Sequence, residues 1–328
     1  MRVRKEGYRF ELLDEDDQPV AVVGSFLEHL ALRGCSPNTV SAYAYDLLHF
    51  FRFLGTQRLG WRDFRPQHAL QLLKHLRSVA ARRPAQRLGL AVVAKTGRGV
   101  KGLAPESINR ALAAVSSFYE YLILSGQFGE GENPVQVRPD PALARVSERH
   151  RPALGSSSRQ RPLRRSVRVK TTRRLPRPLS AKQLDALLGA VKNLRDKAAI
   201  AVMYEGGLRP GEVLGLRLED IDYAHRRVVV RWRDDHPKGV RSKSRSERVV
   251  DLYEGRALPA LNAYVMTERP QEATSPLVFL ICRAGAQRAE PLSYAGFVRA
   301  FSRAAERAGI REPWVTPHAL RHTHATKM

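Results

Sequence analysis

The chain has few cysteines and no long apolar run, and both absences narrow its class. Its two cysteines, Cys35 and Cys282, lie far apart in the sequence, so they offer neither a disulfide framework nor the ligand spacing of a zinc site. No stretch of about 18 apolar residues occurs, which excludes an ordinary membrane-spanning helix. Residues 1–20 are charged throughout and lack the apolar centre of a signal peptide. We therefore expect a cytoplasmic protein with reduced thiols and no membrane partner.

Acidic residues are also scarce relative to basic ones. The chain has 56 Lys+Arg against 32 Asp+Glu, a formal net charge of +24. Such an excess indicates a polyanionic partner, usually nucleic acid. The alternative is a protein from a basic proteome that merely tolerates the charge.

The charge is concentrated between two regions of different pattern. Residues 138–178 contain 13 Lys+Arg and 2 Asp+Glu, a net charge of +11. This stretch is rich in Pro and Ser and has no apolar period, which predicts an extended basic linker. Such a linker either follows a phosphate backbone or is simply solvated. With 328 residues, about two domains are expected: residues 20–137 after an N-terminal extension of residues 1–19, and residues 179–328.

The N-terminal region is predicted to be a small helical bundle. Ser36 can cap a helix that starts at Pro37, carries apolar residues at helical spacing and stops at Gly55. The segments "VAVVGSFLEHLALRG", "PQHALQLLKHLRSV" and "SINRALAAVSSFYEYLILSG" show the same helical period.

The C-terminal region mixes helices and strands. Ser180 and Gln183 form a capping box before an apolar helix. The runs "RRVVVRW" and "SERVVDLY" are rich in β-branched residues and should pair as antiparallel strands, with "PLVFL" as a third. Further helices are predicted over "RDKAAIAVMYEGG", "LRPGEVLGLRLEDID", "SYAGFVRAFSRAAERAG" and the final "TPHALRHTHATKM". The sequence thus predicts a mainly helical domain with a small antiparallel β-sheet.

Three segments of this region carry residues suited to phosphoryl chemistry. They are "YEGGLRPGEVLGLRLEDID" with Arg209, "RSKSRSERVVDL" with Lys243, and "TPHALRHTHAT" with His318 and Arg321, which share one helical face. Two arginines can grip the non-bridging oxygens of a phosphorane-like state with planar, bidentate forks. A lysine can protonate a departing oxygen, and a histidine near its neutral pKa can manage the proton of a nucleophile.

Taken in order with "SPNTVSAYAYDLLHFFRFL", these segments resemble the tyrosine recombinases, the phage-integrase family. The resemblance implies a helical, SAM-like core-binding domain and, from about Pro178, a catalytic domain, which together clamp duplex DNA. It implies site-specific strand exchange through a 3′-phosphotyrosyl link with no metal or nucleotide cofactor. It also implies a bacterial, nucleoid-associated protein of mobile-element or phage type, whose full-length form assembles as a tetramer on paired sites. Arg209 and Arg321 would bind the phosphate, Lys243 would act as acid, and His318 would handle the nucleophile's proton.

Other roles are open to several of these residues. Arg209 could simply be a helix-entry residue with no catalytic role, and His318 could be a core histidine. Glu212 is expected to be a buried partner that orients an arginine. A metal site built on His318, His322 and His324 lacks a carboxylate or cysteine to complete it, so no metal is predicted. Phosphate contacts are expected from the hairpin and the linker, namely Arg233, Lys238, Arg241, Arg245, Arg164 and Arg165.

The nucleophile is not found in this sequence. The family supplies its tyrosine a few dozen residues after the histidine, and all ten tyrosines here precede His318. The sequence therefore predicts a chain that binds duplex DNA without cleaving it, whether as a fragment, a decayed mobile-element gene or a genuine short form. Rival hypotheses are a non-catalytic DNA-binding protein and a topoisomerase-like nicking enzyme. RNA binding is disfavoured, because no aromatic-rich sheet motif is present.

Overall fold

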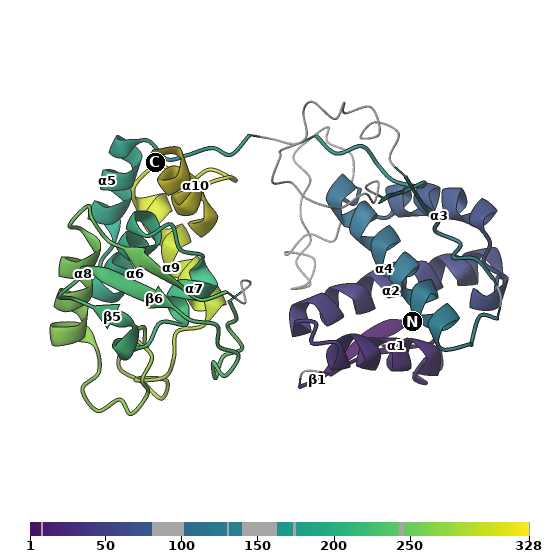
Figure 1. The fold of residues 1–328 in the computed structure, drawn as a ribbon, viewed down its shortest axis with the longest axis horizontal. Helices are drawn as coiled ribbons and strands as arrows, with labels where there is room; N and C mark the ends of the chain where they lie inside the picture. The colour runs from purple at the N-terminus through teal and green to yellow at the C-terminus, as the bar shows by residue number, and fades with distance from the viewer. Residues whose placement is uncertain are drawn as a thin grey trace, which may run out of the picture. The chain divides into compact units, whose positions relative to one another are not determined.

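The chain folds into two compact units, each with its own hydrophobic core (Figure 1). The structure is a computed structural model. The units are Met1–Arg173 and Arg174–Met328, so their boundary falls inside the segment expected to be a linker. The structure describes residues 1–7, 9–80, 102–129, 131–139, 163–172, 175–242 and 246–327.

The N-terminal unit is a helical bundle with a β-hairpin at its start. Residues 1–19, expected to be an extension, instead form antiparallel strands β1 and β2, with Val3 opposite Leu12. Leu12 and Leu13 are 0% and 1% exposed, so the hairpin belongs to this unit's fold. The described elements are β1 (Arg2–Glu6), β2 (Arg9–Leu13), α1 (Ala21–Leu32), α2 (Pro37–Gln57), η1 (Trp61–Asp63), α3 (Pro66–Ser78), α4 (Pro105–Leu124), β3 (Val137–Pro139) and β4 (Leu163–Arg165).

Helix α2 begins as its sequence predicts but ends later. The Ser36 hydroxyl accepts a hydrogen bond from the Thr39 backbone N–H at 3.2 Å. The helix continues past Gly55 and ends at Gln57, and the following residue, Arg58, adopts a left-handed conformation with φ of 53°. The prediction of an end at Gly55 was wrong because a single helical glycine costs only about 1 kcal/mol. Buried aromatic side chains of the helix pack against other elements and outweigh that cost. The rings of Phe50, on α2, and Phe64, which follows η1, are 5.0 Å apart and nearly perpendicular.

Part of the expected linker is instead packed on the N-terminal unit. Strands β3 and β4 pair antiparallel, with Arg138 opposite Arg164. After β4, Val167 and Val169 pack against the core of this unit. The side chain of Asn109 on α4 donates to the carbonyl oxygen of Val169 and accepts from its N–H, both at 2.9 Å. We call residues 163–172 the basic strap; its two docking valines explain why it is not a free connector.

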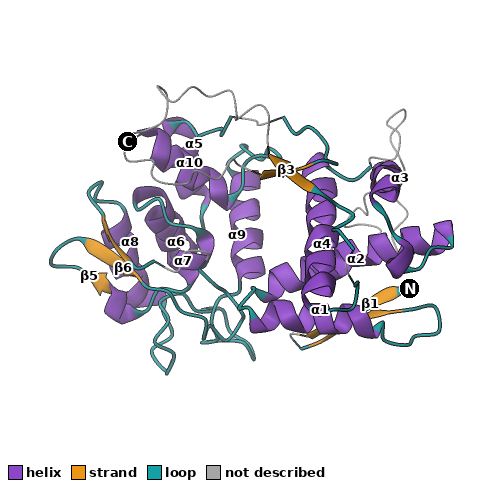
Figure 2. Ribbon diagram, turned by 45° about the vertical axis from the view of Figure 1, so that its right-hand side comes forward, coloured by secondary structure: helices purple, strands orange, loops and turns teal. Residues whose placement is uncertain are grey.

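Helices are the main regular structure of the C-terminal unit, and its strands form one small sheet (Figure 2). Val228 and Val230 point from the sheet into the core and are 0% and 2% exposed. The elements are α5 (Ala181–Ala190), α6 (Leu194–Glu205), α7 (Pro210–Leu214), η4 (Leu218–Asp220), β5 (Ile221–Asp222), β6 (Arg227–Val230), β7 (Arg248–Asp251), α8 (Ala257–Ala263), η5 (Tyr264–Glu268), α9 (Tyr294–Arg307) and α10 (Pro317–Lys327).

The sheet has the order β5-β6-β7 and is antiparallel. The predicted pairing of the two valine-rich runs is confirmed, with Val228 opposite Val250 and Val230 opposite Arg248. The third strand is β5, not "PLVFL". That segment makes only single bridges, Arg217 to Leu277 and Leu280 to Pro291. Its apolar run reflects burial in the core, since a buried segment of this length cannot be told from a strand by pattern alone.

Two glutamates cap helices of this unit. The Glu205 carboxylate, at the end of α6, accepts from the N–H groups of Gly255, Arg256 and Ala257 at the start of α8. The Glu268 carboxylate, at the end of η5, accepts from the N–H groups of Leu194 and Arg195 at the start of α6. Each carboxylate satisfies N–H groups that a helix leaves unpaired at its start. This fixes the end of α6, from which the segment containing Arg209 departs.

Membrane-spanning helices are not found among the described ranges, because no helix there is both long and apolar enough to cross a bilayer.

Candidate functional site

A tight glycine-rich turn presents Arg209. Between α6 and α7 the chain passes through Gly206, Gly207 and Leu208, and Gly207 has a φ of +59°. A Cβ on Gly207 would lie 2.4 Å from Cδ2 of His324 on α10. A Cβ on Gly211, at the start of α7, would lie 2.5 Å from the carbonyl oxygen of Arg241. Glycine at these positions lets α10 and the β6–β7 loop approach the turn closely.

Glu212 binds Arg209 from inside the unit. Its side chain is fully buried. One carboxylate oxygen, Oε2, accepts from the Arg209 backbone N–H at 2.8 Å, and Oε1 accepts from Arg209 Nη1 at 3.0 Å. Burial alone would raise the pKa of Glu212, but hydrogen bonds from Arg248 and Arg209 outweigh it and hold that pKa below its usual value. The carboxylate is therefore charged, and it lies where the sequence placed a partner that orients an arginine.

Arg248 binds the same carboxylate from β7. Its Nη2 donates to Oε2 of Glu212 at 2.7 Å and its Nη1 donates to Oε1 at 3.2 Å. Sequence reasoning missed this residue, because nothing local separates it from the other arginines of the "RSKSRSERVV" stretch. A single signal could have found it: the strand alternation places Arg248 on the same face as Val250, which packs toward the core.

Arg321 joins this group from α10. Its Nη1 donates to the carbonyl oxygen of Gly207 at 2.6 Å. Burial lowers the pKa of Arg321, and the positive charges of Arg209 and Arg248 lower it further. The structure thus brings together three guanidinium groups around one carboxylate; we call Arg209, Arg248, Arg321 and Glu212 the arginine cluster. Its excess of positive charge suits an anion with several oxygens, such as a phosphodiester.

His318 lies on α10, one turn before Arg321, and its side chain is exposed. Helix α10 is held near its middle, where the Thr323 hydroxyl accepts from the Leu179 N–H at 2.8 Å. The structure therefore places His318 and Arg321 on one element that is tied to the rest of the unit.

The structure describes some of the expected phosphate-contact residues of the β6–β7 loop but not the lysine. Lys243 and Arg245 lie outside the described residues, although the carbonyl of nearby Arg241 abuts Gly211. Arg233 makes an internal ion pair: its guanidinium binds Asp220 at 2.6 Å, and its side chain is 16% exposed. Lys238 is likewise paired, with Glu290 at 2.6 Å. Both pairs tie the β6–β7 loop to its own unit, so these two cations are engaged internally.

The two linker arginines both lie in the basic strap. Arg164 lies in β4, and its side chain is outside the described part of the chain. Arg165 is partly buried, and its Nε has no hydrogen-bond partner among the described residues. Burial raises the pKa of nearby Tyr43, and the positive charge of Arg165 opposes that rise without cancelling it.

None of the tyrosines of this unit makes a hydrogen bond to the arginine cluster within the described ranges. Tyr264 is buried, donates to the Val278 carbonyl at 3.1 Å and accepts from the Leu280 N–H at 3.0 Å, and burial raises its pKa. The hydroxyl of Tyr204 accepts from Lys327 Nζ at 3.2 Å. Tyr253 is 77% exposed, and its bond with Asp251 raises its pKa. A raised pKa leaves less of a phenol in its nucleophilic phenolate form at neutral pH, which disfavours Tyr264 and Tyr253; Tyr204 is engaged by Lys327. We assign none of the three as the nucleophile.

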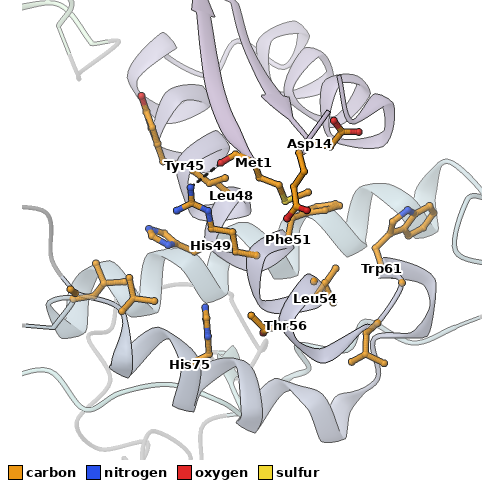
Figure 3. A pocket seen from close by; sticks show the side chains of 18 of the residues that line it. Met1, Asp14, Tyr45, Leu48, His49, Phe51, Leu54, Thr56, Trp61 and His75 are labelled. Atoms are coloured by element: carbon orange, nitrogen blue, oxygen red, sulfur yellow. Dashed lines mark hydrogen bonds between the residues drawn. The ribbon is translucent and has the colours of Figure 1, made fainter. Parts of the chain in front are cut away.

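A hollow of about 1280 Å³ lies elsewhere, in the N-terminal unit (Figure 3). Figure 3 shows His49 and His75 beside it. The guanidinium of Arg52, which also lines the hollow, donates to the carbonyl oxygen of Met1 at 2.9 Å. Its lining includes Ala80 and Leu103, and we assign it no ligand. Within the described part of the chain, no group of three His, Cys, Asp or Glu is arranged to hold a metal ion.

The sequence matches two domain families. Residues 177–328 match the phage integrase family, and residues 23–94 match the phage integrase N-terminal SAM-like domain. Transposase A from transposon Tn554 of Staphylococcus aureus is 28% identical over 318 residues, covering 97% of this chain and 82% of that protein. Tyrosine recombinase XerC of Herpetosiphon aurantiacus is 28% identical over 314 residues, covering 92% and 80%.

Solved structures share the fold. The Tn1549 transposon integrase in complex with transposon right end DNA has 17% identity and a TM-score of 0.58, covering 93% of this chain and 85% of that one. The XerH site-specific recombinase bound to difH substrate has 16% identity and a TM-score of 0.57, covering 94% and 74%. With both domain families matched in order and the arginine cluster in the catalytic match, the chain belongs to the phage integrase family, the tyrosine recombinases.

Proposed function

We propose that this protein binds duplex DNA and acts in site-specific strand exchange, with the arginine cluster as the site of the scissile phosphate. The observation that carries the proposal is the convergence of Arg209 and Arg321 beside one buried carboxylate. Arg321 has one Nη bound to Gly207 and Arg209 has one bound to Glu212. The remaining N–H groups of both guanidiniums have no hydrogen-bond partner among the described residues, so each has an edge available to phosphate oxygens.

The chemistry follows from this charge arrangement. In the strand transfer of this family a tyrosine oxygen, for which no residue of this sequence is assigned, bonds to phosphorus, the bond to the 5′ oxygen breaks, and that oxygen takes up a proton. Negative charge builds on the non-bridging oxygens, which Arg209 and Arg321 would stabilise. His318, exposed on α10, would accept the nucleophile's proton, and Lys243 would protonate the leaving oxygen. The phosphotyrosyl link conserves the bond energy, so no nucleotide cofactor is required.

The N-terminal unit would supply further DNA contacts as the core-binding domain. The Tn1549 transposon integrase was solved in complex with transposon right end DNA, and a lambda integrase dimer was solved bound to a core site. By analogy we propose duplex DNA and further copies of the recombinase as partners, acting at the bacterial nucleoid. Exposed Arg168 and Lys170 on the basic strap would contact phosphates.

The test begins with selection of a target from a randomised duplex library. We expect the protein to enrich a site and to bind it in a salt-dependent manner, and we expect Arg209→Ala or Arg321→Ala to weaken binding roughly tenfold to a hundredfold. A denaturing gel of the same reactions detects a covalent protein–DNA adduct, which separates strand cleavage from binding alone. The proposal would be refuted if no duplex were enriched, or if both alanine variants bound the selected site as tightly as the wild type does.

A further inference from the structure

Arg248 holds Glu212 with a two-pronged contact. Its Nη2 lies 2.7 Å from Oε2 and its Nη1 lies 3.2 Å from Oε1. Both terminal nitrogens of the guanidinium are thus directed at one carboxylate. A fork-to-fork pair of this kind fixes the plane of the carboxylate as well as its position.

The acceptor capacity of Glu212 is thereby filled. Oε1 accepts from Nη1 of Arg209 and Nη1 of Arg248, and Oε2 accepts from the Arg209 backbone N–H and Nη2 of Arg248. A carboxylate has about four lone-pair sites, so no second orientation serves all four donors. Since Glu212 is fully buried, rotation away from Arg248 would leave a charged oxygen unpaired. Arg248 therefore determines where Glu212 holds Arg209.

The same residue links the β6–β7 loop to α7. The carbonyl of Arg241, on the outgoing side of the loop, packs against Gly211. Arg248, on the returning side, binds Glu212 one residue further along α7. Arg241 and Arg248, which lie on either side of residues 243–245, thus both contact the short helix α7, whose N-cap residue is Arg209.

We propose that Arg248 is a positioning residue of the strand-transfer site, which acts through Glu212 to hold Arg209 with its free edge toward the scissile phosphate. The proposal rests on the proposed function of the arginine cluster. The two terminal nitrogens of Arg248 are occupied by Glu212, whereas Arg209 uses only Nη1 on that carboxylate. The two arginines therefore have different roles: Arg209 binds the phosphate, and Arg248 fixes the position of the Arg209 guanidinium through Glu212.

The experiment replaces single phosphates of the selected duplex, one at a time, with neutral methylphosphonate and measures the affinity of each duplex. The phosphate bound by Arg209 is the one whose neutralisation weakens the wild type much more than it weakens Arg209→Ala, in which Arg321 remains. We expect a roughly tenfold or larger effect there in the wild type. In Arg248→Gln we expect this position-specific effect to fall to about twofold or less, with the other positions unchanged.

Matched variants separate positioning from folding. Glu212→Gln should reproduce the Arg248→Gln pattern of affinities. The double variant should show no larger loss than either single variant, because both changes interrupt the same contacts from Arg248 through Glu212 to Arg209. Arg227→Gln is the control: it removes a similarly exposed arginine of the same sheet whose partner is Asp222, and it should keep the wild-type pattern. If Arg248→Gln does not fold, Arg248→Lys retains the charge without the fork and should show the same selective loss.

Other outcomes would overturn the inference about Arg248 or the proposed function on which it rests. If Arg248→Gln lowers the affinity for every duplex by one factor, or keeps the full effect at the Arg209 phosphate, then Arg248 is only a structural ion pair. Additive losses in the double variant would also overturn the inference, because Arg248 would then act independently of Glu212. If the wild type shows no phosphate whose effect depends on Arg209, the proposed function itself fails, which is a distinct outcome.

Discussion

Gly207 is the residue at which the turn, α10 and Arg321 meet. Its φ of +59° is a left-handed conformation, and a Cβ there would overlap the His324 ring. Its carbonyl also accepts the hydrogen bond of Arg321. We predict that Gly207→Ala lowers the free energy of unfolding by about 2 kcal/mol or more, because left-handed backbone alone costs an alanine about 1–2 kcal/mol. Urea unfolding monitored by circular dichroism measures this.

A second glycine provides a control, because its replacement by alanine should raise the unfolding free energy and not lower it. Gly189 lies in α5, and a Cβ added there would meet nothing within 4 Å. Gly189→Ala should therefore raise the unfolding free energy by up to about 1 kcal/mol through helix propensity. Equal stability of Gly207→Ala and the wild type would show that the close approach of His324 is not a constraint.

Glu212 makes the stability of the C-terminal unit depend on pH. Its folded pKa lies below its usual value of 4.5, so its contribution is fully present above that value and is lost as pH falls through the folded pKa. We predict that Glu212→Gln lowers the unfolding free energy at pH 7 by about 2–4 kcal/mol, and that the difference from the wild type shrinks as pH falls below 4.5. Urea titrations at several pH values measure both. A difference independent of pH would contradict the assignment of a charged carboxylate.

Single residues were predictable from the sequence only where a motif marked them. Arg209 follows two glycines and precedes Pro210, and Arg321 follows His318 at helical spacing, so both stood out locally. The partners of Arg233 did not, because Asp220 lies 13 residues away and reaches it only through the sheet. Arg248 was missed for the same reason, since its partner Glu212 is 36 residues away.

At the scale of elements, α6 and the α8–η5 segment stabilise each other through their glutamates. Glu205 is 4% exposed and accepts three backbone N–H groups at the start of α8, at 2.7–3.2 Å. We predict that Glu205→Gln lowers the unfolding free energy by about 1–3 kcal/mol, because a neutral amide accepts these bonds through one oxygen and places its N–H₂ group against other donors. Equilibrium unfolding in urea tests this.

Glu306 provides the matched control for that substitution. It lies in α9, and its side chain is 62% exposed, with Arg311 3.9 Å away. Glu306→Gln should change the unfolding free energy by less than about 0.5 kcal/mol. If the two substitutions have equal effects, the caps do not stabilise the helix pair.

Helix starts were predictable because their signals are local. Ser36, Ser180 and Ser293 each cap the helix that follows, through a hydrogen bond between neighbouring residues. The third strand was not, because the two-residue β5 has no apolar period of its own and is defined by pairing with β6. The basic strap was missed because its docking depends on Asn109, which is 60 residues from Val169. Pairing or docking with another segment decided both of the features that were missed.

At the scale of the whole molecule, the net charge of +24 favours binding to any polyanion, so the informative quantity is how many charges the DNA contacts. The basic strap holds Val167 and Val169 against the N-terminal unit and leaves Arg168 and Lys170 exposed between and after them. Alternate residues of an extended segment point to opposite sides. The docking of the valines therefore presents both cations outward together, where phosphates can reach them.

We predict that Arg168→Gln combined with Lys170→Gln reduces the slope of log Kd against log salt concentration by about 1.8, since each phosphate contact contributes about 0.9. The loss should be similar on the selected site and on unrelated duplex, because phosphate contacts do not read sequence. The matched control is Arg2→Gln combined with Arg4→Gln, which also removes two positive charges. Those arginines are already paired with Asp17 at 2.9 Å and Glu11 at 2.5 Å. An unchanged slope in the control and a reduced slope in the strap variant would identify a local contact, whereas equal reductions would mean that only the net charge matters.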